Sequence, residues 1–199
     1  MARKPTPGAR DGILDTAARL FYDHGVHRVG LQLVIDEYGC GKNLLYREFQ
    51  SKDDLVVAWL ERCHADWETR IRAKTEHLAG DPAAQLVAIV ADAAEIASRP
   101  EFHGCAMRNT RAEFPDADHP AHRVADDRLA GVRAHLRDLA EQAHARDPDA
   151  LADRLMLIVD GINTGGARGD GKASVGAAVS FAEEVVRAAT PTSRRKRRS

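Results

Sequence analysis

The sequence is poor in aromatic residues and in cysteine, and it contains no long hydrophobic run. Aromatic residues make up 5% of its 199 positions, whereas alanine, the strongest helix former, occurs 34 times. Residues that favour strands are therefore outnumbered by residues that favour helices. This balance excludes an all-β fold and predicts an all-α protein, with one sizeable core or two small cores that share an interface.

No apolar run is longer than six residues, as at residues 86–91, whereas a membrane-spanning helix needs about 20 apolar residues. The start of the sequence is basic, but it leads into no apolar stretch of the kind that signal peptides contain. We therefore expect a soluble, cytoplasmic protein. Cys40, Cys63 and Cys105 show no C-x-x-C spacing, which favours reduced thiols over a disulfide framework or a zinc site.

An excess of charge of one sign is also missing, since 29 basic residues face 30 acidic ones. Residues 1–62 carry no net charge, residues 63–193 carry −6 and residues 194–198 carry +5. No whole domain is basic. Any binding of nucleic acid must therefore come from locally placed cations.

Apolar residues recur with the period of an α-helix along most of the chain. A Gly-Cys-Gly turn at residues 39–41 separates two short helices, and three short helices with such a turn before the last are the layout of a helix-turn-helix. Ser51 is the expected N-cap of the next helix, whose apolar stripe runs to Leu78 with Lys74 in one slot. The predicted helices cover residues 10–24, 31–38, 42–49, 52–78, 83–98, 121–146, 149–165 and 174–189, with at most one short helix within 101–120.

Two segments, RDGILDTAARLFYDHG (10–25) and GCGKNLLYREFQSKDDL (39–55), resemble the DNA-binding head of the TetR family of bacterial transcriptional regulators. A third, GCAMRNTRAEFPDADHPAH (104–122), is similar to a segment of some regulators of this type. The resemblance and the composition together predict four parts. These are a flexible arm (1–9), a helix-turn-helix DNA-binding domain (10–55), a helical ligand-binding and dimerisation domain (56–190) and a disordered basic tail (191–199).

The resemblance implies a homodimeric transcriptional regulator, a repressor that a small-molecule effector releases from a pseudo-palindromic DNA operator. An enzyme is not expected, because no convincing catalytic constellation is present. The alternative function is a helical protein that binds a small molecule or a partner and whose DNA binding is weakened or lost. The neutral head favours this alternative, as does Glu48, which stands where the family often has histidine or an aromatic residue.

The second helix of a helix-turn-helix places its N-terminal part in the major groove. Here that part contains Lys42, Asn43 and Leu44, with Arg47 one turn later. Asparagine can pair with adenine, lysine or arginine with guanine, and leucine can contact the methyl group of thymine. These four residues are the predicted base readers.

Phosphate contacts are expected from three further residues. Tyr46 and Lys52 match family positions that contact phosphate, and Lys52 also lies at a helix N-terminus, where backbone N–H groups favour an anion. Arg10, at the start of the first helix, is a third candidate. The alternative is that Arg47 and Lys52 are ordinary surface charges and that Tyr46 belongs to the core.

Other positions depart from the family pattern. Gly30 and Gly41 replace the hydroxyl residues that usually open the two helices of the motif, so each helix loses a side-chain cap. Ile35 and Tyr38 replace alanines, so bulkier side chains must pack between the helices of the head.

By family analogy a ligand pocket lies in the helical body. Candidate lining residues are Cys63, Trp67, Cys105, Met107 and Asn109, with plain core packing as the alternative role for each. The apolar stripes of residues 149–165 and 174–189 are wider than one core needs, which predicts a homodimer through these two helices in a four-helix bundle. The alternative is that both stripes only cover the core of their own chain.

Three weaker motifs are interpreted as structural. Residues 166–172 have the G-x-x-x-x-G-K spacing of a phosphate loop, but Ala173 replaces the hydroxyl residue that binds magnesium and a helix precedes the segment, so we expect a flexible link. His103 lies near Cys105 without a third group to orient it. A turn in which Asp118 caps the following helix is preferred over a metal site formed by Asp116, Asp118, His119 and His122. No metal or cofactor is predicted.

Overall fold

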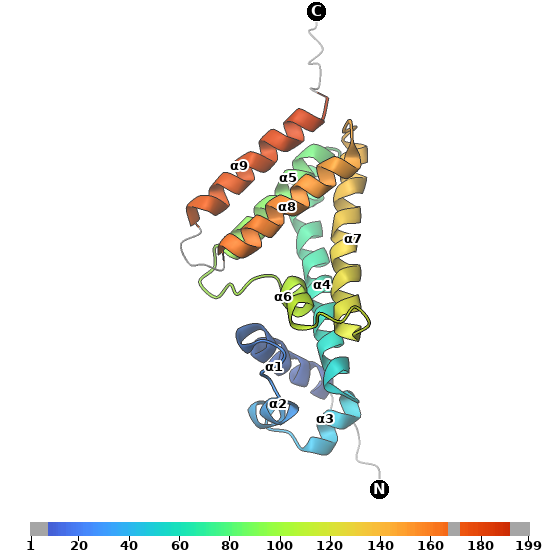
Figure 1. The fold of residues 1–199 in the computed structure, drawn as a ribbon, viewed down its shortest axis with the longest axis vertical. Coiled ribbons are helices and arrows are strands. Elements are labelled where there is room, and N and C mark those ends of the chain that lie inside the picture. The colour runs from blue at the N-terminus through green and yellow to red at the C-terminus, as the bar shows by residue number, and fades with distance from the viewer. Residues whose placement is uncertain (1–7, 167–171, 192–199) are drawn as a thin grey trace, which may run out of the picture. The chain divides into compact units, whose positions relative to one another are not determined.

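The computed structural model describes residues 8–166 and 172–191, and within these ranges it contains nine α-helices, one 3₁₀-helix and no strand (Figure 1). The all-α prediction is confirmed. The predicted arm, the 166–172 motif and the basic tail lie largely outside the described residues. Among the helices that are described, none combines the length and the hydrophobicity that a bilayer span requires.

The helices follow the predicted order. The first half of the chain forms α1 (Ala9–His24), α2 (Leu31–Tyr38), α3 (Lys42–Glu48), α4 (Lys52–Thr75), a 3₁₀-helix (Glu76–Leu78) and α5 (Pro82–Ala97). The second half forms α6 (Ala106–Glu113), α7 (Pro120–Gln142), α8 (Pro148–Gly166) and α9 (Lys172–Ala189).

Two helices end a turn or so earlier than predicted. The stripe of α4 was predicted to run to Leu78 as regular helix, but its last three residues tighten into the 3₁₀-helix. The helix predicted over 121–146 ends at Gln142, because His144 adopts a left-handed conformation (φ 55°) and the N–H of Ala145 donates to the carbonyl of Ala140 at 2.9 Å. This pairing closes a helix C-terminus in the manner of a Schellman turn.

The chain divides into two compact units. Unit 1 comprises residues 1–67 and 105–128, and unit 2 comprises residues 68–104 and 129–199. Unit 1 therefore contains the predicted helix-turn-helix together with the first part of α4, all of α6 and the start of α7. The boundary predicted at residues 55 and 56 stays a prediction.

In unit 1, α1, α2 and α3 pack against one another. Gly39 ends α2 in a left-handed conformation (φ 73°), and the carbonyl of Ile35 accepts from the N–H groups of Gly39 and Cys40 at 2.9 and 3.1 Å. The bulk of Tyr38 is accommodated by Gly12 of α1, where an added Cβ would lie only 2.6 Å from the tyrosine ring. The core of this head is formed by Ile13, Ala17, Phe21, Val34, Leu45 and Phe49, which are all nearly inaccessible to solvent.

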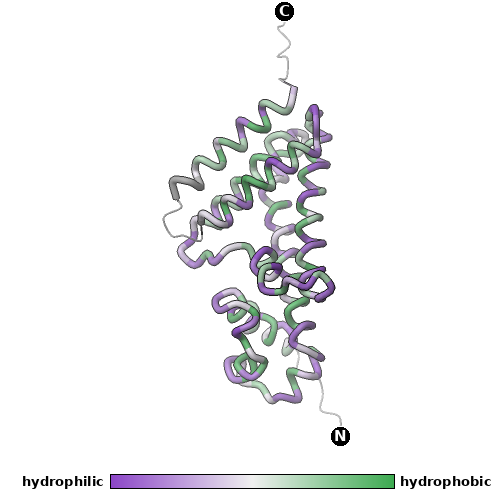
Figure 2. Tube along the Cα trace, in the orientation of Figure 1, coloured by the Kyte–Doolittle hydropathy of each residue, from purple (hydrophilic) through white to green (hydrophobic). Residues whose placement is uncertain are grey.

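In unit 2, α5, α8 and α9 pack against one another (Figure 1). Hydrophobic residues recur along α8 and α9 in Figure 2, and Leu151, Leu155, Ile162, Ala182 and Val186 are buried. The unit also contains a buried carboxylate, because Asp92 of α5 is only 2% exposed. Its oxygens accept hydrogen bonds from Nε of Arg70 at 3.0 and 3.1 Å, and Lys74 lies 3.1 Å away, which explains the lysine in the apolar stripe of α4.

Candidate nucleic-acid interface

Helix α3 has one buried and one exposed face. Leu45 and Phe49 are 0% and 1% exposed and anchor the helix to the head. Lys42, Asn43 and Arg47 lie on the opposite, exposed face. The fourth predicted base reader, Leu44, is half-buried. The inner residues fix the helix, so its outer side chains are presented from a rigid support.

Tyr46 also lies on the exposed face of α3, with 43% of its surface accessible. This placement rules out the alternative in which Tyr46 is a core residue. The ammonium group of Lys42 lies 5.7 Å from the centre of the tyrosine ring, within the range of a cation–π contact. The two side chains therefore lie side by side on the exposed face of α3.

Arg47 is paired with its neighbour Glu48. Two guanidinium nitrogens of Arg47 lie 3.0 and 3.1 Å from one carboxylate oxygen of Glu48. The Arg47 side chain remains 40% exposed, and an exposed ion pair of this kind contributes at most about 1 kcal/mol. A phosphate or a guanine can therefore compete for Arg47 at small cost.

Arg10 has partners within the protein. Its Nη1 donates to the carbonyl oxygen of Glu48 at 2.5 Å, and its guanidinium carbon lies 4.2 Å from the centre of the Phe49 ring. A cation at the last carbonyls of a helix is favourable because of the helix dipole. Arg10 thus stabilises the C-terminus of α3, a contact that the sequence did not indicate.

Lys52 opens α4. Ser51 caps this helix as predicted, since its hydroxyl oxygen accepts from the N–H of Asp54 at 3.0 Å. Lys52 itself is half-buried, and burial lowers the pKa of its ammonium group below the ordinary value, while nearby Glu113 and Asp53 act in the opposite direction. Lys52 is the first residue of α4, and backbone N–H groups at such a helix start favour an anion.

The candidate ligand-lining residues lie on α4 and on or next to α6. Cys63, Trp67 and Cys105 are half-buried, Met107 is buried and Asn109 is exposed. Burial is the main cause that raises the pKa of the Cys63 thiol to about 11, and the nearby Cys105 acts in the same direction. Both thiols therefore lie in one region of unit 1, between α4 and α6.

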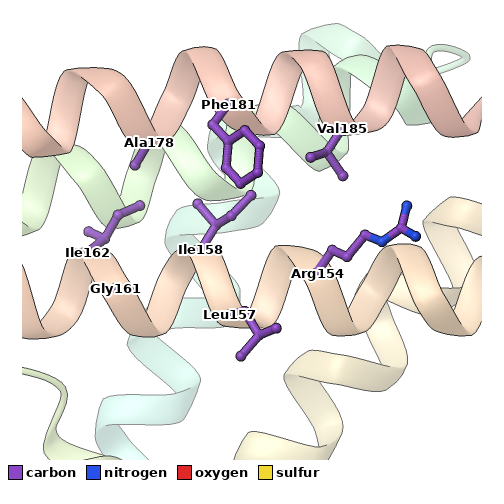
Figure 3. Close-up of a pocket in the computed structure, with 8 residues that line it drawn as sticks. All are labelled: Arg154, Leu157, Ile158, Gly161, Ile162, Ala178, Phe181 and Val185. Atoms are coloured by element: carbon purple, nitrogen blue, oxygen red, sulfur yellow. The ribbon is translucent and has the colours of Figure 1, made fainter.

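Unit 2 carries an open apolar cavity of about 690 Å³ between α8 and α9. Leu157 and Phe181 border it and are 70% and 55% exposed, although both are large and hydrophobic. The lining residues are Arg154, Leu157, Ile158, Gly161, Ile162, Ala178, Phe181 and Val185 (Figure 3). The sequence interpretation missed Leu157 and Phe181, although Ala178, Phe181 and Val185 follow the helical spacing of three and four residues.

The residues weighed as a metal site have other partners. His119 stacks on Phe114 at 4.2 Å and lies 3.5 Å from Asp53, and within the described residues no cluster of three or more potential ligands occurs. The prediction that Asp118 caps α7 was wrong. The acceptor at the start of α7 is Nδ1 of His119, which accepts from the N–H of Ala121 at 3.2 Å. Val175 of the α9 stripe and the 166–172 motif are not covered by the described side chains.

Known proteins share both the head and the whole fold. Residues 13–59 match the family model of bacterial regulatory proteins of the tetR family. The HTH-type transcriptional activator FasR of Mycolicibacterium smegmatis is 38% identical over 64 residues, which are 32% of this chain and 29% of FasR. The chain thus spans less than a third of that relative.

Two solved structures cover almost the entire chain. SCO4454, a TetR-family transcriptional regulator from Streptomyces coelicolor, is 28% identical with a TM-score of 0.87, over 92% of this chain and 96% of its own. A protein described as a TetR-type transcriptional regulator (sav143) from Streptomyces avermitilis is 30% identical with a TM-score of 0.80, over 91% of this chain and 97% of its own.

Proposed function

Because this chain belongs to the TetR family of bacterial transcriptional regulators, we propose that it acts as a homodimeric repressor, which binds a pseudo-palindromic operator until a small-molecule effector releases it. The similar proteins are transcriptional regulators, which are not enzymes. We place its action in the bacterial cytoplasm, where the DNA is.

The exposed polar face of α3, held from behind by Leu45 and Phe49, is the observation that carries this proposal. Lys42, Asn43 and Arg47 read base edges in the major groove, with Leu44 against a thymine methyl group. Because Leu44 is half-buried, its contribution is the smallest of the four.

Phosphate contacts position the head but carry little sequence information. Tyr46 and Lys52 make these contacts in the proposed complex. Arg10 already donates to the Glu48 carbonyl, so its first role is to support α3. A contact with phosphate is its second role in the proposed complex.

A second copy of the chain covers the apolar face of α8 and α9 in the proposed dimer. The exposure of Leu157 and Phe181 supports this role, because large apolar side chains at the rim of an open cavity are unfavourable in water. Association of two such helix pairs forms a four-helix bundle with two-fold symmetry. Two α3 helices can then bind half-sites about one turn of DNA apart.

The effector binds in the body, with Cys63, Trp67, Cys105, Met107 and Asn109 as candidate contacts. It releases the operator by the difference between its affinities for the DNA-binding and the non-binding conformation. FasR is named a transcriptional activator, which favours a variant of this proposal in which the protein activates transcription. The second candidate function, a binding protein with weakened DNA affinity, is favoured by the Arg47–Glu48 ion pair, which neutralises a cation of the proposed interface.

A selection of genomic DNA fragments by the full-length protein at moderate salt tests the proposal. We expect capture of specific fragments, lost in the double variant Lys42→Ala/Arg47→Ala and weakened about equally for all fragments in Lys52→Ala. The matched control is Arg72→Ala, an exposed arginine of α4 in unit 2, which should leave capture unchanged. A folded dimer that retains no specific fragment would contradict the proposal and favour the second candidate.

A further inference from the structure

Glu113, the last residue of α6, binds the loop between α1 and α2. One carboxylate oxygen accepts from the N–H of Val26 at 3.0 Å and the other accepts from the N–H of His27 at 2.7 Å. The carbonyl oxygen of Glu113 lies 2.7 Å from Nε2 of His27, which therefore donates to it. All these residues belong to unit 1, and three hydrogen bonds connect two segments that are 86 or more residues apart in sequence.

The loop is shaped around this carboxylate. Gly25 ends α1 with a φ of 81°, a conformation that residues with a side chain rarely adopt. A Cβ added at this glycine would lie 3.3 and 3.4 Å from the two carboxylate oxygens of Glu113. The positive φ therefore favours glycine here, and the absence of a side chain also leaves room for the carboxylate.

Phe114, the next residue, extends the same contact. Its ring contacts the rings of His27 and His119, with centroid distances of 4.5 and 4.2 Å. Its carbonyl oxygen accepts from Nδ1 of His122 at 2.6 Å. The end of α6 therefore holds the α1–α2 loop on one side and the start of α7 on the other.

Glu113 is well placed to act through its charge. Bonds from backbone N–H groups to a carboxylate are roughly twice as strong as bonds between neutral groups. A glutamine has the same length but keeps only one acceptor oxygen, and its amide hydrogens would oppose the second N–H group. Substitution by glutamine therefore breaks the two-bond arrangement with almost no change in volume.

We infer that Glu113 is a positioning residue for operator recognition: its carboxylate fixes the α1–α2 loop and with it the orientation of α2 and α3 within unit 1. This inference rests on the proposed function. The residue contacts neither bases nor phosphates in the proposed complex. Instead, it helps both α3 helices of a dimer to enter their half-sites at the same time, which requires a defined distance between the two helices.

The experiment uses the full-length protein, the operator recovered by fragment selection and duplexes in which the half-sites are moved apart or together by one or two base pairs. We expect the wild type to prefer one spacing. Glu113→Gln should bind the preferred duplex about tenfold more weakly and should discriminate less between spacings. Its affinity for random DNA should not fall and its salt dependence should be unchanged, because loss of the Glu113 charge near Lys52 removes no phosphate contact. Glu101→Gln, at an exposed glutamate outside unit 1, is the matched control.

Hydrogen exchange separates a positioning role from a merely structural one. The N–H groups of Val26 and His27 should exchange faster in Glu113→Gln, while circular dichroism and the melting midpoint show whether the fold is kept. Faster exchange together with an unchanged spacing preference would overturn the inference. If Glu113→Gln does not fold, Glu113→Asp, which keeps the charge but shortens the side chain by one methylene group, takes its place, and faster exchange at Val26 and His27 together with wild-type discrimination in that variant would overturn the inference. A wild type that captures no specific fragment defeats the proposed function and this inference with it.

Discussion

The outer face of α3 and the outer face of α8 and α9 are both exposed, but their chemistry is opposite. The first presents Lys42, Asn43 and Arg47, which are well solvated. The second presents Leu157 and Phe181 beside an apolar cavity. A polar, cationic face binds through charge and weakens as salt rises, whereas an apolar face associates through the removal of surface from water and responds little to salt. Raising the salt concentration should therefore weaken binding through the α3 face while it leaves association through the α8–α9 face almost unchanged.

The largest expected effect comes from a charge on the apolar face. Leu157→Glu places a carboxylate where the second copy would cover it, and two-fold symmetry introduces the change twice. We expect the dissociation constant of the dimer to rise at least about 100-fold. Light scattering at micromolar concentration should then give a monomer near 21.7 kDa.

The matched control for this variant is Leu33→Glu, because Leu33 of α2 is also an exposed leucine, at 39%, but lies in unit 1. It should leave the dimer intact. A wild-type protein that is itself a monomer, or a Leu157→Glu variant that dimerises normally, would contradict the assignment of the α8–α9 face.

A second prediction concerns the buried carboxylate that stabilises unit 2. Unit 2 contains the buried carboxylate of Asp92, with Arg70 and Lys74 as partners that are about one third exposed. Asp92→Asn removes the charge but keeps the volume, so Arg70 loses this counter-charge and Lys74 keeps only its pairing with Glu95. We expect the free energy of unfolding to fall by about 2 kcal/mol, less than for a fully buried pair because the cations reach water. Urea titration measures the change.

Glu95→Gln is the appropriate control, since Glu95 also pairs with Lys74 but is 59% exposed. Its loss should lower the free energy of unfolding much less than Asp92→Asn does, because water screens an exposed pair. Equal effects of the two substitutions would mean that the burial of Asp92 has no energetic consequence.

The smallest expected effect tests the steric fit inside unit 1. Alanine at an interior helix position is normally about 1 kcal/mol more favourable than glycine. At Gly12 the added methyl group would meet the ring of Tyr38 at 2.6 Å, so this gain should be cancelled in the wild type. In the Tyr38→Ala background, Gly12→Ala should stabilise the protein by about 1 kcal/mol.

A double-mutant cycle over these two positions measures the coupling, which should be about 1 kcal/mol. Strict additivity of the two substitutions would show that the Tyr38 ring moves aside freely. Such a result would place the rigidity of the head in its hydrogen bonds rather than in its packing.

Most of the fold was predictable because it depends on local signals. The bounds of α2 agree with the prediction to the residue, since Gly30 and Gly39 flank a periodic apolar pattern. The end of α7 was placed wrongly because His144 takes a left-handed conformation that glycine usually adopts. Periodicity alone gave no sign of that turn.

The candidate site was predictable only in part. The exposed residues of α3 follow from the burial of Leu45 and Phe49, which the helical spacing indicates. The partners of the Glu113 carboxylate are backbone groups of Val26 and His27, which carry no sequence signature and lie far away along the chain. The bond from Arg10 to the Glu48 carbonyl was hidden for the same reason.

The contact between Gly12 and Tyr38 has an evolutionary consequence. A substitution that enlarges position 12 gains stability only once the residue at position 38 has become smaller, so stability favours one order of the two changes. Among descendants of this gene, a methyl group at the first position should accompany a small residue at the second. While the tyrosine is present, an alanine at position 12 brings no gain in stability.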